Sequence, residues 1–335
     1  MMRALRPQAA GRYHERKVVI LMARSLERSP AVKIVLAVLA VLLVLALGAL
    51  AFAGNYMFTF ALDPHAPGGM IGGDQGSVLE GDAAWLQDSS EDRWLTSRDG
   101  LTLHGLYVPQ EGSHRYAVLC HGYGSVPQTM GASAVRFHDM GFHVLAPAAR
   151  AHGRSEGRYV SMGWLEREDI VDWVGTITAQ DPQAEIVLFG ISMGGATVMM
   201  TAGEELPANV KCIIEDCGYS SVWDEFAVQL QDMFGLPTFP VLDAASLVCQ
   251  IRAGYSFKQA SAVEQLEKAS LPMLFIHGEE DAFVPYSMLD VVYGACASPE
   301  KERLSVPGAA HGEAASADPE LYWSTVEAFL AKHMG

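Results

Sequence analysis

A run of twenty apolar residues near the N-terminus constrains this chain more than any other feature. From Ile34 to Ala53 the sequence IVLAVLAVLLVLALGALAFA has no charged or strongly polar side chain. Lipid offers the backbone no hydrogen-bond partners, so such a run crosses a bilayer as a helix, and its length suits the ~30 Å hydrocarbon core. A buried helix of a globular domain would need a polar face. The sequence therefore predicts one N-terminal transmembrane helix, assigned to residues 34–60.

The charges around this run predict its orientation. Residues 1–33 carry eight basic and two acidic side chains, whereas the whole chain has a net charge of −16. The positive-inside rule then places the basic tail in the cytoplasm and the rest of the chain outside the cell membrane. The alternative is a cleaved signal peptide ending at Ala51-Phe52-Ala53, although the run exceeds the usual length of about 7–15 residues. A start at Met22 would leave the topology unchanged.

The composition of the chain argues against some classes of partner and some kinds of site. The acidic balance argues against a nucleic-acid partner, because phosphate backbones need clustered Lys and Arg. No two cysteines have CxxC spacing, and we expect free apolar thiols in the core rather than disulfides or a metal site. The five are Cys120, Cys212, Cys217, Cys249 and Cys296. The glycine-rich residues 61–84 are interpreted as a flexible spacer.

Residues 85–335 alternate between apolar strand patterns and helical patterns. This alternation predicts an α/β domain with a mostly parallel sheet and helices on both faces. Arg98-Asp99-Gly100 lies between two strand patterns and predicts a hairpin near the start of the domain. Residues 218–265, rich in Trp, Phe, Leu and Met, interrupt the rhythm. We interpret them as a small helical cap over the site; the alternative is ordinary helices packed at the edge of the sheet.

The segment Gly190-Ile191-Ser192-Met193-Gly194-Gly195 matches the pattern G-x-S-x-G. The apolar strand EIVLF precedes it and the helical segment ATVMMTA follows it. Glycines at these positions allow a sharp strand-to-helix turn that exposes the serine hydroxyl at the carboxyl edge of the sheet. The context therefore predicts that Ser192 is a nucleophile.

A serine needs a general base, and the base needs a carboxylate that orients it. Three histidines follow Ser192, and His311 is the candidate base because it lies in a loop just after the last predicted strand. His277 ends a strand and is interpreted as structural, and His333 lies at the C-terminus. Asp281, after the strand MLFI, is the candidate acid, with Asp216 as the alternative.

Two backbone N–H groups are expected to stabilise the tetrahedral oxyanion. One is that of Met193, directly after the nucleophile. The other is that of Tyr123, in the glycine-rich loop His121-Gly122-Tyr123-Gly124-Ser125. The side chain of His121 is interpreted as a structural group that holds this loop.

Residues 90–333 resemble the α/β-hydrolase superfamily. More narrowly, they are similar to membrane-anchored bacterial esterase-like hydrolases of the serine aminopeptidase and lysophospholipase branch. The residues that carry the resemblance are HGYGS (121–125), PAARAHGRSEG (147–157), GWLEREDIVDWV (163–174), GISMGG (190–195), HGEEDAFVP (277–285) and PGAAHG (307–312). The second block departs from the family pattern, with Ala148 in place of Asp and Ala151 in place of Gly.

The resemblance implies hydrolysis of carboxylic esters through an acyl-enzyme, without metal or cofactor, on a small-molecule or lipid-like acyl substrate. A peptidase or amidase is the alternative within the fold. It would need a carboxylate for the substrate amine, for which Glu215, Asp216 and Asp224 are candidates. A non-catalytic binding protein is the alternative from another class. Such proteins usually lack a triad residue, and here all three candidates are present.

Overall fold

The computed structural model describes residues 29–69 and 79–334. Residues 1–28 of the predicted basic tail and residues 70–78 of the predicted spacer lie outside the described residues. The chain divides into two compact units, residues 1–53 and residues 54–335.

Helix α2 (Pro30–Leu62) contains the apolar run. Within the described ranges it is the one helix that is long and apolar enough to cross a membrane. It begins before and ends after the predicted span of residues 34–60. Side chains along the apolar run are exposed, whereas Phe58, Ala61 and Leu62 near its C-terminal end are buried. The candidate membrane span and the packed end are therefore separate parts of one helix.

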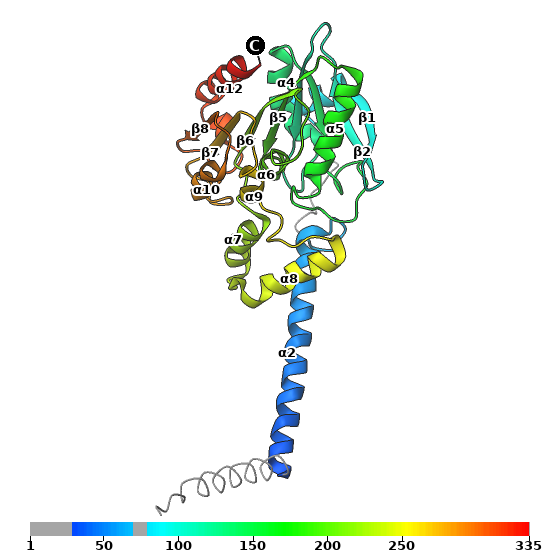
Figure 1. The fold of residues 1–335 in the computed structure, drawn as a ribbon, viewed down its shortest axis with the longest axis vertical. Coiled ribbons are helices and arrows are strands. Elements are labelled where there is room, and N and C mark those ends of the chain that lie inside the picture. The colour runs from blue at the N-terminus through cyan, green and yellow to red at the C-terminus, as the bar shows by residue number, and fades with distance from the viewer. Residues whose placement is uncertain (1–28, 70–78, 335) are drawn as a thin grey trace, which may run out of the picture. The chain divides into compact units, whose positions relative to one another are not determined.

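The second unit is built on an eight-stranded sheet with the order β1-β2-β4-β3-β5-β6-β7-β8 (Figure 1). β1 and β2 form the hairpin predicted around Arg98-Asp99-Gly100, and β2 pairs antiparallel with β4. The remaining pairs are parallel, which confirms the mostly parallel sheet. The strands are β1 (Glu91–Thr96), β2 (Thr102–Val108), β3 (Arg115–Cys120), β4 (His143–Pro147), β5 (Glu185–Ile191), β6 (Val210–Asp216), β7 (Met273–Gly278) and β8 (Lys301–Val306).

Helices cover both faces of this sheet. Successive side chains of a strand point to opposite faces, so an apolar core lies on each side of the sheet. In β5, Ile186 and Leu188 pack into one apolar core while Val187 and Phe189 pack into the other. The first core is covered by α5 (Glu166–Gln180), α6 (Met193–Thr201), α9 (Ala262–Leu266) and α10 (Ser287–Ala295). The second is covered by α3 (Gly81–Ser89), η1 (Pro127–Met130), α4 (Gly131–Asp139), α11 (Ala314–Ala317) and α12 (Pro319–His333).

The interval 218–265 forms helices between β6 and β7. α7 (Val222–Phe234) and α8 (Thr238–Ala253) pack against each other, and we call these two the cap helices. The Ser221 hydroxyl accepts a hydrogen bond from the Asp224 N–H, which fixes the first turn of α7. The five cysteines are free and buried, as the sequence predicted.

The compact unit begins earlier in the sequence than residue 85, where the sequence placed the start of the domain. Residues 54–62 belong to it because Phe58, Ala61 and Leu62 bury their side chains in its core. Helix α3 belongs to it as well, with Leu86 fully buried. Burial of apolar surface thus ties both segments to the sheet domain.

Candidate active site

Ser192 lies between the end of β5 and the first residue of α6, in a strained backbone conformation with φ 59° and ψ −119°. No side chain can be accommodated two residues before or two residues after it. A Cβ on Gly194 would overlap the carbonyl group of Cys120, and one on Gly190 would overlap the carbonyl group of Gly194. The Ser192 N–H donates to the Asp216 carbonyl at 2.8 Å. The turn therefore exposes the hydroxyl above the sheet edge, as a nucleophile elbow requires.

The structure brings the three predicted side chains together. The Ser192 hydroxyl donates to Nε2 of His311 at 2.8 Å. The Nδ1–H of His311 donates to Oδ2 of Asp281 at 2.7 Å. His311 lies in the loop after β8 and Asp281 in the loop after β7, so the parallel strands deliver all three groups to one edge of the sheet.

Asp281 is buried and held in place by its neighbours. Its Oδ1 accepts the N–H groups of Phe283 and Val284 at 3.0 Å and 2.9 Å. Burial opposes its ionisation, but hydrogen bonds from His277 and His311 outweigh that effect and lower the pKa of Asp281 to about 2. The carboxylate is therefore charged at neutral pH and can stabilise an imidazolium.

The other candidates from the sequence have different surroundings. His277 is fully buried and its Nε2–H donates to the Val284 carbonyl at 2.9 Å, with Oδ2 of Asp281 at 3.3 Å. It thus holds the loop that carries Asp281. The carboxylate of Asp216 accepts from the Tyr322 hydroxyl at 2.8 Å rather than from His311. Helix α12 carries His333, whose ring packs against Phe329.

The loop predicted to supply an oxyanion donor lies beside the nucleophile. A Cβ on Gly122 would be 3.5 Å from the Cβ of Ser192. Among the described residues, neither the Tyr123 N–H nor the Met193 N–H donates to another part of the chain. Met193 also begins helix α6, whose dipole favours negative charge at this end. Both N–H groups are thus free to bind an oxyanion.

Two histidines fix this loop. His121 Nδ1–H donates to the Gly122 carbonyl at 2.8 Å, and His121 Nε2 accepts the Ala149 N–H at 3.0 Å. Burial lowers the pKa of His121 to about 3, so its ring is neutral. His152 Nε2 accepts the Gly124 N–H at 3.0 Å. The sequence did not single out His152, although it lies in one of the blocks that carry the family resemblance.

Ser192 borders a cavity whose space, including the part that is open to solvent, is about 330 Å³. Most of its lining is apolar or aromatic: Tyr123, Met162, Tyr219, Phe226, Phe283 and Val284. The exceptions are Gln229 and Glu225, both from α7. Glu225 is buried, and burial raises its pKa to about 8. Its Oε1 accepts from the Gln229 amide at 3.0 Å, while its Oε2 has no partner among the described residues. No motif or spacing in the sequence singled out Glu225.

One group of side chains here has donor atoms close enough to bind a metal ion: Cys217, Asp281 and His311, within 4.8 Å of one another. His311 and Asp281 are already hydrogen-bonded to each other, however. Burial raises the pKa of the Cys217 thiol, which disfavours the thiolate that a metal would need. The donor set fits a hydrogen-bonded triad better than a metal site.

An eight-stranded, mostly parallel sheet with a serine at a strained strand-to-helix turn defines the α/β-hydrolase class. Residues 112–233 match the family model described as serine aminopeptidase, S33. The chain therefore has the α/β-hydrolase fold, and its residues 112–233 are similar to the serine aminopeptidase family.

Individual proteins agree with this assignment. The chain is 26% identical over 237 residues to the uncharacterized protein YqkD of Bacillus subtilis, which covers 70% of this chain and 77% of YqkD. It is 24% identical over 250 residues to the thermostable monoacylglycerol lipase of Bacillus sp. strain H-257, covering 65% of this chain and 91% of the lipase. The structure of Pyrococcus furiosus esterase Pf2001 superposes with a TM-score of 0.64 at 22% identity, covering 77% and 97% of the two chains.

Proposed function

We propose that this protein is a serine hydrolase that cleaves carboxylic esters through an acyl-enzyme. The observation that carries the proposal is the pair of hydrogen bonds, of 2.8 Å and 2.7 Å, that link Ser192 to His311 and His311 to Asp281. Serine is a poor nucleophile unless an adjacent base removes its proton, and this arrangement supplies the base and its orienting acid.

The first half of the reaction forms the acyl-enzyme. Ser192 Oγ attacks the ester carbonyl carbon while His311 Nε2 takes the hydroxyl proton. Asp281 stabilises the resulting imidazolium, and the N–H groups of Tyr123 and Met193 bind the oxyanion, a contribution of about 3–4 kcal/mol per donor. His311 then gives its proton to the departing alkoxide, and the C–O bond of the ester breaks.

The second half releases the acid. His311 removes a proton from a water molecule, which attacks the acyl carbonyl and forms a second tetrahedral intermediate. His311 returns the proton to Ser192 Oγ as the acyl–oxygen bond breaks. The mainly apolar lining of the cavity beside Ser192 supports an ester with an apolar acyl group.

A fluorophosphonate probe and nitrophenyl esters test this function. The full chain in detergent should react with the probe and hydrolyse the esters, and Ser192→Ala should do neither. Ser220→Ala is a matched control, because Ser220 is a buried serine that is bonded to Asp224 rather than to His311. Labelling that persists in Ser192→Ala contradicts the assignment of the nucleophile. A wild-type protein without labelling or turnover supports the non-catalytic binding protein instead.

Hydrolysis of aminoacyl amides is the second candidate function, and one observation favours it. Glu225 lines the Ser192 cavity and its Oε2 has no partner among the described residues, so a substrate amine could pair with it. The three carboxylates considered from the sequence do not line this cavity. Glu215 accepts the Gly218 N–H, Asp216 accepts from Tyr322, and Asp224 binds two serine hydroxyls.

Aminoacyl nitroanilides and nitrophenyl esters distinguish the two activities. The esterase proposal expects ester turnover with little amide turnover. An aminopeptidase would cleave the nitroanilides, and Glu225→Gln would raise their KM while changing that of neutral esters little. Glu264→Gln is the matched control, because Glu264 lies outside the cavity lining, on α9.

We further propose that α2 is an uncleaved membrane anchor, with the N-terminus in the cytoplasm and the hydrolase unit outside. The apolar run and the basic residues before it support this topology. Added protease should digest the hydrolase unit in intact cells or spheroplasts. Digestion only after lysis would contradict the orientation. The N-terminal sequence of the mature protein should begin before Ile34, whereas one that begins after Ala53 indicates a cleaved signal peptide.

A further inference from the structure

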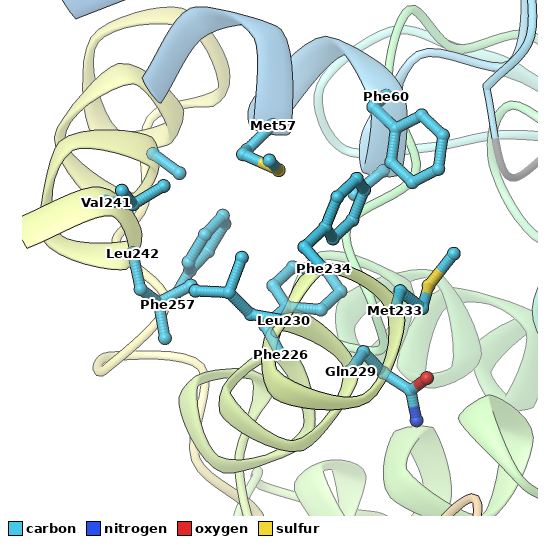
Figure 2. A pocket seen from close by; sticks show the side chains of 12 residues that line it. Met57, Phe60, Phe226, Gln229, Leu230, Met233, Phe234, Val241, Leu242 and Phe257 are labelled. Atoms are coloured by element: carbon cyan, nitrogen blue, oxygen red, sulfur yellow. The ribbon is translucent and has the colours of Figure 1, made fainter. Parts of the chain in front are cut away.

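The C-terminal turns of α2 and the cap helices enclose a second cavity, which lies wholly within the compact unit of residues 54–335. The space between its side chains, including the part that is open to solvent, is about 430 Å³. Figure 2 shows Met57 and Phe60 pointing from α2 toward the side chains of α7 and α8. Apart from Gln229, every side chain in the lining is apolar. We call this cavity the anchor-end pocket.

The polar exception does not make the pocket polar. The Gln229 amide donates to Oε1 of Glu225 at 3.0 Å and to the Phe283 carbonyl at 2.9 Å. In Figure 2 this amide points away from the cluster of apolar side chains. The pocket therefore offers no free polar group to a ligand, which favours a hydrocarbon chain as its occupant.

The pocket adjoins the cavity of the nucleophile. Phe226 and Gln229 line both the anchor-end pocket and the cavity that contains Ser192. These two side chains of α7 therefore lie between the two cavities, and a substrate chain that starts at Ser192 would have to pass them. Beyond them lie Met57, Phe60 and Ala61 of α2 and Val241, Leu242 and Ala245 of α8.

The end of α2 is also hydrogen-bonded to Tyr123, in the loop expected to supply an oxyanion donor. The Tyr123 hydroxyl donates to the Ala61 carbonyl, and the Val160 N–H donates to the Leu62 carbonyl at 2.9 Å. Tyr123 is the residue whose N–H we assign to the oxyanion site. The last turn of α2 thus contacts the oxyanion loop and the anchor-end pocket together.

Helix α8 is held against the same turns. Arg252 Nη1 donates to Oδ1 of Asn55 at 2.8 Å, and its guanidinium lies 4.9 Å from the centre of the Phe58 ring. A Cβ on Gly54 would overlap Ala244 of α8, so the two helices are in close contact there. The wall that α2 forms is therefore packed against the cap.

We propose that the end of the anchor helix is part of the substrate site. On this reading, which rests on the proposed ester hydrolysis, the anchor-end pocket takes the acyl chain of the substrate. Its preferred substrates are esters of unbranched fatty acids whose chains reach from Ser192 past Phe226 to Met57 and Phe60. The helix that the sequence assigns only to membrane attachment then also sets the acyl-chain specificity.

Kinetics on an ester series test this assignment. The full chain in detergent is assayed on nitrophenyl esters from acetate to myristate, and kcat/KM is expressed relative to acetate. Each methylene that the pocket buries should raise this ratio by about fourfold. Met57→Trp and Val241→Trp fill the pocket from two different helices, α2 and α8. Exclusion of two methylenes should lower the ratio for long-chain esters by about tenfold or more, so the preferred chain becomes shorter.

Leu247→Trp is the matched control. It makes the same kind of enlargement on α8, but Leu247 is 58% exposed and does not line the pocket. It should keep the wild-type chain-length profile. Reaction with the fluorophosphonate probe confirms that Ser192 is competent in each variant.

Three results bear against the assignment. Unchanged profiles in both pocket variants, with Ser192 fully labelled, would overturn it. An equal shift in Leu247→Trp would overturn it too, because that side chain lies outside the pocket. A wild-type protein that neither labels nor turns over any ester defeats the proposed function itself, and the chain-length assignment fails with it.

Discussion

The backbone of Ser192 leads to a prediction about stability. With φ 59° and ψ −119°, the residue occupies a region in which a Cβ is strained and glycine is not. Replacing Ser192 by Gly should therefore relieve strain, whereas Ser192→Ala keeps the Cβ and the strain. Both changes remove the hydroxyl and its hydrogen bond to His311. The difference between the two variants isolates the backbone effect.

The expected difference in melting temperature between the two variants follows from the strain and from the size of the compact unit. Relief of such strain is worth about 1–3 kcal/mol, and the greater freedom of glycine in the unfolded chain costs about 0.4–1 kcal/mol. With the middle of each range, the net gain is about 1–1.5 kcal/mol. For roughly 280 residues, the entropy of unfolding is about 0.6 kcal/mol per kelvin. Ser192→Gly should therefore melt about 1–3 °C above Ser192→Ala.

Differential scanning fluorimetry of the purified variants, in one detergent and at one protein concentration, measures this difference. The control is a serine in an unstrained helical conformation: Ser246, in the interior of α8, should be less stable as glycine than as alanine. A Ser192→Gly variant that melts at or below Ser192→Ala refutes the strain argument. The result would then indicate that the turn costs the fold nothing.

Three further predictions concern neighbouring residues. Asp281→Asn should lower kcat on nitrophenyl esters by about 10⁴-fold, because His311 loses the partner that fixes its tautomer, whereas Asp216→Asn should change kcat little; equal losses would reverse the assignment of the acid. Gly194→Ala should cost more than about 4 kcal/mol in chemical denaturation, since its Cβ would overlap the Cys120 carbonyl. Between pH 4.5 and 8 the folded state keeps a proton on Glu225 that the unfolded state releases. The Tm of the wild type should therefore fall with rising pH relative to that of Glu225→Gln. Parallel curves of Tm against pH for the two proteins would contradict the raised pKa of Glu225.

Much of the structure can be predicted from local patterns in the sequence. The turn around Ser192 could be expected because two glycines, an apolar strand and a helix occur within a dozen residues. The meeting of Asp281 and His311 with it follows from topology, since loops after parallel strands share one edge of a sheet. The choice of Asp281 over Asp216 depended on loop position, and the structure adds the Tyr322 hydroxyl as the partner of Asp216.

Contacts between distant segments could not be predicted in the same way. Glu225 lies in the apolar cap interval, and nothing local shows that its carboxylate faces the Ser192 cavity. The bond between His152 and the Gly124 N–H joins two loops separated by 28 residues. Such side chains acquire a function through packing, and neither hydrophobic periodicity nor a short motif encodes which loop they meet.

The end of α2 is the exception, because the sequence does change where the helix begins to pack. Up to Ala53 the apolar side chains lie on all sides, as they should in lipid. From Gly54 on, polar Asn55 and Thr59 alternate with Gly54, Phe58 and Ala61, which are spaced by four and three residues. That spacing marks one face of a helix packed on a protein surface. The buried residues follow this face, while Asn55 and Thr59 bond to Arg252 of α8. A transmembrane segment that becomes amphipathic before it ends thus indicates that its last turns belong to the domain it anchors.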